Sequence, residues 1–287
     1  DPDHITVSLA RVATAVGPEL GAEADLHRLA GMGMAVAGIV DPVEGRLGRS
    51  PNLPGWEDKN LAKAARDVFG QVETAFANDV NAALYGEFAQ GAGRDCADLV
   101  MIALGTGVGG GVMVGGHLVT GTHHGAGEIG HTFLDPDGPV CTCGNRGCLE
   151  AWAGSVGILK RARAAAESGA RGLKVALEEH GAGFTPRHLA DLANAGDPDA
   201  LEIFTETGRR LGQAIGNLVN VLDPGRVIIG GGVSRAGDLI LSPCRAAVPD
   251  LVLAAEAKNV PIVEAELGTL AAAVGAACLA KEKGRLD

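Results

Sequence analysis

The sequence predicts a mixed α/β protein of two domains, and three observations lead to this fold class. The chain has 287 residues, which is long enough for two domains that each bury a core of their own. Apolar runs with strand character alternate with segments of helical periodicity along the chain. Glycine occurs 44 times, about twice its average usage, while aromatic residues make up only 3%. Such a chain has many tight turns and close backbone approaches.

The first third of the chain alternates helix and strand patterns. The predicted elements, in order, are a helix over residues 5–16, a buried strand over 33–41, a turn-rich loop over 41–56, a helix over 60–69, and a short strand that runs directly into a helix over 72–88. Asn78 and Asp79 stand at the junction of that last strand and helix. Polar residues at such a junction are candidates for helix capping as well as for chemistry.

The rest of the chain begins with strands and continues mainly with helices. Residues 98–121 predict a strand, a glycine loop, a second strand, a hairpin turn at Gly115 and Gly116, and a third strand. The elements that follow are a helix over 155–169, two helices that start at the pairs Thr185 with Pro186 and Asp197 with Pro198, a strand that enters a glycine turn within 226–234, and a closing helix over 268–284. The helix after Asp197 is expected to stop at 223–225 and to bury one apolar face, made of Leu201, Phe204, Leu211, Ile215, Leu218, Val219 and Leu222.

Charge and hydropathy exclude several classes of partner. The formal net charge of −11 disfavours nucleic acid and anionic membranes. No apolar run approaches the roughly 18 residues that a membrane span needs. Residues 1–17 lack the basic start and apolar core of a signal peptide, so we expect a cytoplasmic, reducing location. There, the isolated Cys96, Cys244 and Cys278 are expected to be small buried hydrophobic residues.

Two glycine-rich turns follow predicted strands. Residues 105–110, "GTGVGG", match the dinucleotide fingerprint G-x-G-x-x-G, but that fingerprint needs a helix to follow and here a strand continues. Successive backbone N–H groups of such a loop can instead wrap phosphate oxygens, with the Thr106 hydroxyl as a further donor. A hairpin without a ligand is the alternative, and it applies equally to residues 230–232. The P-loop pattern does not occur in the sequence, which excludes P-loop chemistry.

Three cysteines and a histidine are concentrated in one segment. "CTCGNRGC" places Cys141, Cys143 and Cys148 within eight residues, and His131 lies ten residues before the first of them. This spacing predicts a closed, tetrahedral Cys3His zinc site, whose role would be structural because no coordination position is left open. A disulfide or a cluster of reduced thiols is the alternative, and neither suits a reducing compartment.

Several acceptor groups lie amid the glycine turns. Asp79 is an N-cap candidate for the helix that follows it, and Glu128 and Glu150 have the alternative of being surface carboxylates. Together with Asn78, however, these three carboxylates suit a ligand that carries many hydroxyl donors, such as a sugar.

At this point the motifs resemble a known family. "NDVNAALYGE", "LGTGVGGG", "GEIGH", "CTCGNRGCLE" and "VIIGGGVS" occur in the order and approximate spacing of bacterial ROK sugar kinases, particularly the glucokinase type, and the resemblance extends through nearly the whole chain. It implies the two-domain actin/hexokinase-like (ribonuclease H-like) α/β fold with a cleft between the domains. The expected small domain is residues 1–84 plus 269–287, and the expected large domain, with the zinc knuckle, is residues 85–268.

The resemblance also implies roles for individual residues. Asp79 would be the catalytic base that takes the proton from the 6-hydroxyl of a hexose. The expected sugar contacts are Gly38, Asn78, Gly105, Glu128, His131 and Glu150. The expected contacts to ATP, which would bind with Mg²⁺, are Gly105, Thr106 and Gly107 for the phosphates and Gly230, Gly231 and Gly232 for the adenosine. The expected zinc ligands are His131, Cys141, Cys143 and Cys148.

The chain departs from the family pattern in one respect, and other functions stay open. The Asp-x-Gly-Gly-Thr phosphate loop of the family does not occur in residues 1–287, and we expect it upstream of Asp1. A sugar-responsive ROK transcription regulator is one alternative function, and a kinase for another hexose, such as N-acetylmannosamine or fructose, is a second. The intact "GTGVGGG" favours a kinase, and glucose is the expected hexose. A homodimer or homotetramer would be usual for the family.

Overall fold

The computed structural model describes residues 31–50 and 53–283, which form two compact units. The helix predicted over residues 5–16 lies outside the described residues. The first unit runs up to Asp95 and also takes in Leu118–Ala126 and the chain from Thr269 onward; the second comprises Cys96–His117 and Gly127–Gly268. A boundary after residue 84 would cut through a helix, and the compact unit continues for eleven residues beyond it.

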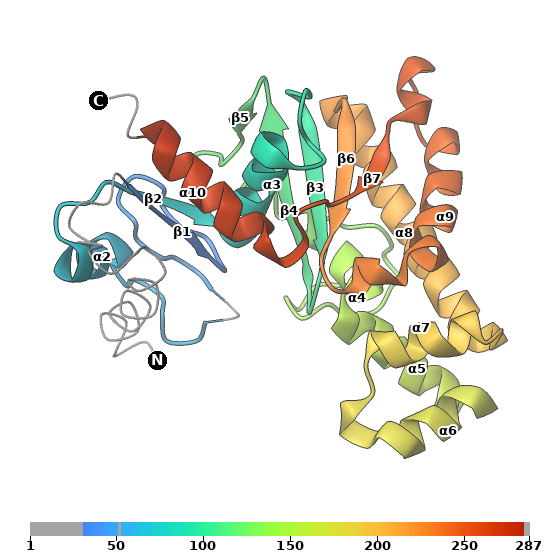
Figure 1. The fold of residues 1–287 in the computed structure, drawn as a ribbon. Coiled ribbons are helices and arrows are strands. Elements are labelled where there is room, and N and C mark those ends of the chain that lie inside the picture. Colours follow the sequence, from blue (N-terminus) through green and yellow to red (C-terminus); the bar gives the residue numbers. More distant parts are fainter. Residues whose placement is uncertain (1–30, 51–52, 284–287) are drawn as a thin grey trace. The chain divides into compact units, whose positions relative to one another are not determined.

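A parallel strand pair forms the centre of the first unit. Strand β1 (Met32–Val36) pairs with β2 (Thr74–Asn78), and α2 (Leu61–Phe69) lies in the connection between them (Figure 1). Parallel strands need such a crossover connection. The core cluster here consists of Val36, Val40, Leu47, Leu61 and Phe76. The strand predicted over 33–41 is shorter in the structure, because the chain turns at Gly38, whose φ is +112°.

Two helices rich in small residues complete this unit. Helix α3 (Asp79–Gln90) follows β2 without a loop, as predicted, and packs against α10 (Ala271–Lys283). The two backbones approach so closely that a Cβ atom on Gly275 would overlap the carbonyl of Ala82. A Cβ atom on Gly86 would lie 3.0 Å from the backbone nitrogen of Gly275. Only glycine fits at these two crossing points.

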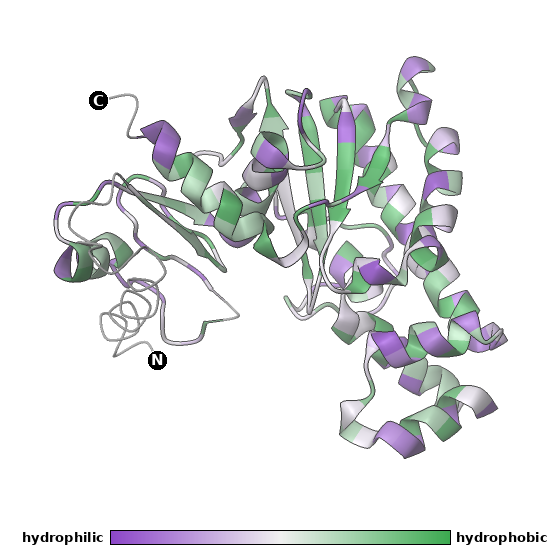
Figure 2. Ribbon diagram, viewed as in Figure 1, coloured by the Kyte–Doolittle hydropathy of each residue, from purple (hydrophilic) through white to green (hydrophobic). Residues whose placement is uncertain are grey.

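A five-stranded mixed sheet forms the centre of the second unit (Figure 1). Its order is β5 (His117–Leu118), β4 (Val108–Val114), β3 (Leu99–Leu104), β6 (Arg226–Gly230) and β7 (Ile262–Glu264). Strand β3 is antiparallel to β4 and parallel to β6, which is parallel to β7. Strand β3 and the part of β6 that follows Arg226 are buried almost throughout and mainly hydrophobic (Figure 2). Strands covered on both faces have this continuous apolar character.

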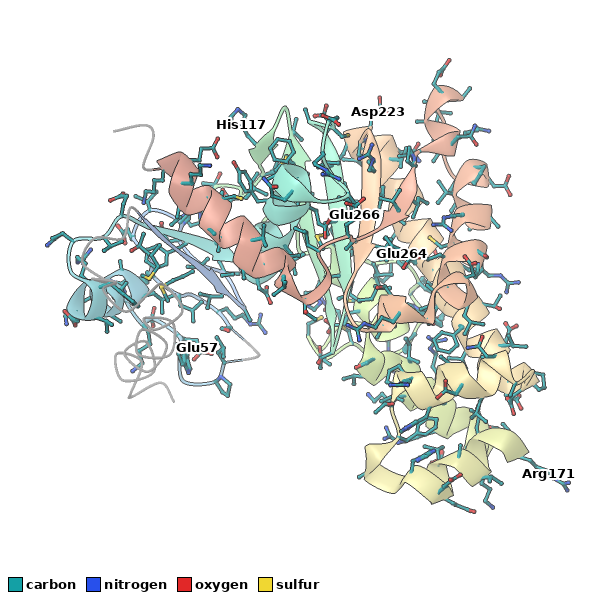
Figure 3. The ribbon with its side chains drawn as sticks, viewed as in Figure 1. Glu57, His117, Arg171, Asp223, Glu264 and Glu266 are labelled. Atoms are coloured by element: carbon teal, nitrogen blue, oxygen red, sulfur yellow. The ribbon has the colours of Figure 1, made fainter. Side chains whose placement is uncertain are left out.

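Six α-helices belong to the second unit: α4 (Leu149–Ala153), α5 (Ser155–Glu167), α6 (Arg171–His180), α7 (Pro186–Asn194), α8 (Pro198–Leu222) and α9 (Asp238–Ala247). Helices α5, α7 and α8 begin where the sequence predicts them, whereas α4, α6 and α9 were not predicted. Asp197 caps α8, because its Oδ1 accepts a hydrogen bond from the backbone N–H of Ala200 at 2.9 Å. Thr185 forms a capping box with His188 at the start of α7. Helix α8 ends before Asp223, which adopts a left-handed conformation beside the start of β6 (Figure 3).

The apolar face predicted for α8 is only partly correct. Leu201 is 37% exposed, whereas Phe204, Leu211, Ile215 and Val219 are buried. A second face was not predicted, and it consists of Gly208, Gly212 and Gly216. A Cβ on Gly208 or Gly212 would collide with the backbone of α9, so these glycines permit the close α8–α9 packing. Glycines do not contribute to a hydrophobic periodicity, so the sequence analysis did not predict the α8–α9 contact.

The three isolated cysteines differ in burial. Cys244 is completely buried, as predicted. Cys96 and Cys278 are only half-buried, so the prediction of small buried hydrophobic residues is wrong for them. The Cys96 thiol lies 3.4 Å from the carbonyl oxygen of Asp98. Across the described ranges, no helix combines the length and the apolarity that a membrane crossing requires.

The α3–α10 contact generates a stability prediction. Replacing Gly275 by Ala adds a methyl group where the Ala82 carbonyl already lies, so we expect the free energy of unfolding to fall by about 1–3 kcal/mol. Urea denaturation followed by circular dichroism measures this change. Gly183→Ala is the matched control, because a Cβ there meets no atom within 4 Å. Equal stability of the two variants would contradict the close approach.

Candidate active site

The β2–α3 junction brings the first group of predicted site residues together. The Asn78 side chain caps α3, since its Oδ1 accepts hydrogen bonds from the N–H groups of Val80 at 2.9 Å and Asn81 at 3.2 Å. Its Nδ2 donates to the carbonyl oxygen of Gly38 at 3.1 Å. Asn78 therefore joins the start of α3 to the turn that follows β1.

Gly38 occupies a position that no other residue fits. Its φ of +112° favours glycine, and a Cβ atom there would lie 2.7 Å from Ser50 Cβ and 2.8 Å from the Arg49 carbonyl. Ser50 is completely buried, and its hydroxyl donates to the carbonyl of Ala37 at 2.6 Å. The Gly38 turn is thus fixed from both sides, by Asn78 and by the 49–50 segment.

Asp79 is not the cap of α3. That role belongs to Asn78, so the N-cap alternative for Asp79 is wrong, and Asp79 is the first residue of the helix. Its Oδ1 accepts a hydrogen bond only from the adjacent N–H of Val80, at 3.0 Å. Over residues 31–50 and 53–283, no cationic side chain forms an ion pair with Asp79. The half-buried carboxylate therefore keeps an oxygen for an outside donor, beside the positive end of the α3 dipole.

The β3–β4 connection is a tight glycine turn. The N–H of Gly105 donates to the carbonyl of Gly107 at 2.9 Å, and the N–H of Ser155 at the start of α5 donates to the carbonyl of Gly105 at 2.9 Å. Within the described residues, the N–H groups of Thr106 and Gly107 have no intramolecular acceptor. The turn therefore presents two successive backbone donors, the arrangement that binds phosphate oxygens.

Glu150, on the first turn of α4, lies against this glycine turn. Its Oε2 accepts a hydrogen bond from the N–H of Val108 at 3.1 Å. A Cβ atom on Gly107 would overlap the same carboxylate oxygen, so position 107 requires glycine. The other oxygen, Oε1, accepts from the Thr142 hydroxyl and lies 3.5 Å from the Cys141 sulfur. The alternative of a free surface carboxylate is wrong for Glu150.

His131, Cys141, Cys143 and Cys148 form one cluster, as the spacing predicts. One ligand atom from each lies within 4.8 Å of all the others. The Cys143 and Cys148 sulfurs are 3.8 Å apart, and Cys141 Sγ is 3.7 Å from His131 Nδ1. A disulfide would bring two sulfurs to about 2.05 Å, whereas about 3.8 Å is the edge of a tetrahedron with Zn–S bonds of about 2.3 Å. The cluster can hold a metal ion.

The three thiols of the cluster differ in how readily they ionise. Burial raises the pKa of Cys141, and burial together with the hydrogen bond that the Cys148 thiol donates to Cys143 raises the pKa of Cys148 to about 12. The backbone N–H of Asn145 lowers the pKa of Cys143. Thiolates at Cys141 and Cys148 therefore need a positive charge at bonding distance, and metal binding deprotonates such thiols.

Glu128 lies on the same short turn as His131. The N–H of His131 donates to the carbonyl of Glu128 at 3.0 Å, within a 3-10 turn over Ile129–His131. Gly127, with a φ of +88°, packs this turn against Gly110 of β4. The Glu128 side chain is exposed. A metal ion bound to His131 would therefore also hold the turn that begins next to Glu128.

The second glycine turn lies at the end of β6. Gly231 has a φ of +91°, and a Cβ atom there would overlap the backbone of Leu104 at the end of β3. Gly232 has open space on the side where a Cβ would stand. This turn therefore lies beside the 105–107 turn, because β3 and β6 are adjacent parallel strands.

Comparison with known proteins assigns these features to a family. The ROK family profile matches residues 16–283. The chain belongs to the ROK family. One relative, the glucokinase of Thermotoga maritima, is 35% identical over 252 residues, which are 88% of this chain and 79% of that protein. The DNA-binding transcriptional dual regulator NagC of Escherichia coli K12 is 30% identical over 256 residues, 89% of this chain and 61% of that protein.

A solved structure confirms the fold of this ROK protein. The ROK family glucokinase of Streptomyces griseus, in complex with glucose and AMPPNP, superposes with a TM-score of 0.79 at 32% identity. The match covers 96% of this chain and 88% of the other. The actin/hexokinase-like fold class and the resemblance to ROK glucokinases, both expected from the motifs, are thereby confirmed.

A group of half-buried charged residues supports the site of this ROK chain and was not found by the sequence analysis. Arg161 donates to the carbonyl of Trp152 at 2.5 Å, to the Thr207 hydroxyl at 2.6 Å and to the carbonyl of Ile203 at 3.1 Å. Burial lowers its pKa to about 10, so it stays protonated at neutral pH. The Arg210 guanidinium lies 4.3 Å from the centre of the Trp152 ring.

These contacts anchor α4, the five-residue helix that carries Glu150. Arg210 also forms ion pairs with Asp135 at 2.9 Å and with Glu206 at 2.7 Å. The available sequence signal was a charged residue on the buried face of a predicted helix: Arg161 follows the buried Ile158 by three positions. Arg171, by contrast, points away from the start of α6 (Figure 3).

The Arg161 contacts predict a large loss of stability on substitution. Arg161→Met removes the donor to three acceptors, two of them backbone carbonyls, so we expect the free energy of unfolding to fall by about 2–4 kcal/mol. The control is Arg163→Met on the exposed side of the same helix. This substitution should change the free energy of unfolding by less than about 0.5 kcal/mol. Urea denaturation decides, and an Arg161 variant as stable as the Arg163 variant would contradict the anchoring role.

Proposed function

We propose that the protein is an ATP-dependent hexose kinase that phosphorylates the 6-hydroxyl of glucose. The glucokinase relatives support this proposal, since they match most of the chain and the chain covers 79% of the Thermotoga protein. The observation that carries it is the pair of unpartnered backbone donors at Thr106 and Gly107, because a turn that presents successive N–H groups is suited to the phosphates of a nucleotide.

Asp79 is the proposed catalytic base. Phosphoryl transfer needs an acceptor oxygen held in line with the phosphate and a group that accepts its proton. The Asp79 carboxylate engages only a neighbouring N–H, so an oxygen is available for the 6-hydroxyl of the sugar. Asn78 and the Gly38 carbonyl, joined by their hydrogen bond, are the proposed sugar contacts beside it.

The second unit supplies the remaining proposed contacts. Glu128 and Glu150 would accept hydrogen bonds from sugar hydroxyls and the His131 Nε2–H would donate one, with the Gly105 backbone as a further contact. His131 can combine this role with metal binding, because its Nδ1 faces the Cys141 sulfur and Nε2 is left for a hydroxyl. Gly105, Thr106 and Gly107 would bind the phosphates of ATP, and Gly230, Gly231 and Gly232 the adenosine. Mg²⁺ bound with ATP would neutralise part of the phosphate charge.

Zinc is the proposed metal of the cysteine cluster. Three sulfurs and one imidazole nitrogen at tetrahedral spacing form a donor set that suits Zn²⁺. All four positions would be filled by protein, so the ion would stabilise the structure rather than take part in the reaction. The free thiols are compatible with a reducing compartment, and a cytoplasmic location is part of the same proposal.

A sugar-responsive transcription regulator is the second candidate function, and the 30% identity with NagC favours it. Such a protein would bind sugar without consuming ATP. The open N–H groups of the 105–107 turn support the kinase instead. Turnover with glucose, fructose and N-acetylmannosamine in parallel would identify the hexose. A homodimer or homotetramer stays a prediction.

The role of Asp79 can be tested by one substitution. Asp79→Asn removes the base but keeps an oxygen for the Val80 N–H, so we expect kcat to fall at least about a hundredfold while the affinity for glucose changes little. Steady-state kinetics and calorimetric glucose binding measure the two effects. Asp67→Asn, on the exposed face of α2, is the control. If Asp79→Asn retained most of its turnover, the base would have to be another residue.

Metal analysis tests the zinc proposal. We expect about one zinc ion per chain in the purified protein, and Cys143→Ser should lower both the zinc content and the midpoint of thermal unfolding. Glucose affinity should fall with them, because the cluster positions the turn that carries Glu128. Cys278→Ser serves as the control outside the cluster. Full glucose affinity in a folded, metal-free protein would contradict this coupling.

A further inference from the structure

The Thr142 hydroxyl and the Glu150 carboxylate lie between the cysteine cluster and the glycine turn. Thr142 stands between two of the cluster residues, Cys141 and Cys143, and its Oγ1 donates to Glu150 Oε1. The second oxygen, Oε2, accepts from the N–H of Val108, at 3.1 Å, at the end of the glycine turn. Three hydrogen-bonding groups in series therefore connect the cluster with this turn.

Glu150 has little freedom at this position. It lies on the first turn of α4, whose N-cap residue is the cluster member Cys148. The Trp152 carbonyl of the same helix is held by Arg161 at 2.5 Å. Oε2 occupies the space that a side chain at position 107 would need. The carboxylate is thus confined between α4 and the backbone of the turn.

The charge of Glu150 makes its orientation important for an anionic ligand. The carboxylate lies against Gly107, and the N–H groups of Thr106 and Gly107 are unpartnered in the described chain. A carboxylate that turned toward them would occupy the donors that a phosphate needs and would repel it. The hydroxyl of Thr142 and the N–H of Val108 each bind one oxygen and so keep the carboxylate away from those donors.

We propose that Thr142 is a positioning residue that holds Glu150 in this orientation and thereby keeps the 105–107 turn open for nucleotide phosphates. The proposal rests on the proposed kinase function, in which this turn binds ATP. It predicts that removing the Thr142 hydroxyl weakens nucleotide binding, although Thr142 itself binds neither ATP nor the metal.

The test compares Thr142→Val with Thr142→Ser in the full-length protein. Val keeps the shape of the side chain and removes the donor, while Ser keeps the donor. Calorimetric titration with AMPPNP in the absence of sugar should show a Kd raised roughly tenfold for Thr142→Val and within about twofold of the wild type for Thr142→Ser. Thr205→Val makes the same hydroxyl-to-methyl change on α8 and should leave the Kd unchanged. Zinc content and thermal midpoint should stay at wild-type values in all three variants.

Three results would overturn the positioning role: wild-type AMPPNP affinity in Thr142→Val, a change confined to the KM for glucose, or loss of zinc in parallel with loss of nucleotide affinity. The last of these would assign the effect to the cluster as a whole. Failure of the wild-type protein itself to bind AMPPNP is a separate result, which would refute the kinase function and the positioning role together.

Discussion

The convergence of His131 and three cysteine sulfurs on one point is the constraint on which the site of the second unit depends. His131 ends the short turn that begins next to Glu128, and Cys148 is the N-cap residue of the helix that carries Glu150. Both carboxylates are therefore attached, within three residues, to a member of the cluster. Two isolated β-bridges, Phe133 with Cys148 and Val140 with Arg146, are the strand-type pairing of this segment, and the convergence of the four side chains adds to them.

In the first unit, the hydrogen bonds of one asparagine side chain position the candidate site residues. One asparagine caps α3 with its oxygen and binds the Gly38 turn with its nitrogen, so Asp79 is fixed by a helix terminus rather than by an ion pair. A carboxylate held in this way is positioned but not neutralised, which suits a group that must accept a proton. Precise placement in both units is obtained from backbone contacts at Gly38, Gly107 and Gly275, where a side chain would not fit.

The sequence predicted those features of the fold and the site that depend on residues close together in the chain. Helix starts at Asp197 and Thr185, the β2–α3 junction and the cysteine spacing each depend on neighbouring residues, and the structure confirms them. Contacts between distant segments were not predicted. The glycine face of α8 has no apolar periodicity, and the hydrogen bonds from Arg161 to Trp152, and from Val108 to Glu150, join residues whose proximity only the fold creates. The sequence motifs identified Glu150 as a candidate site residue but did not predict its contact with the glycine turn.

The kinase function itself is tested most directly by following the phosphorus atoms of the reaction. Phosphorus NMR of the full-length protein with Mg²⁺, ATP and glucose resolves ATP, ADP and the sugar phosphate separately. The account predicts that ADP and glucose 6-phosphate appear together in equal amounts, and that ATP is stable when glucose is omitted. Glucose binding without any transfer of phosphate would contradict it and would favour a sugar-responsive regulator.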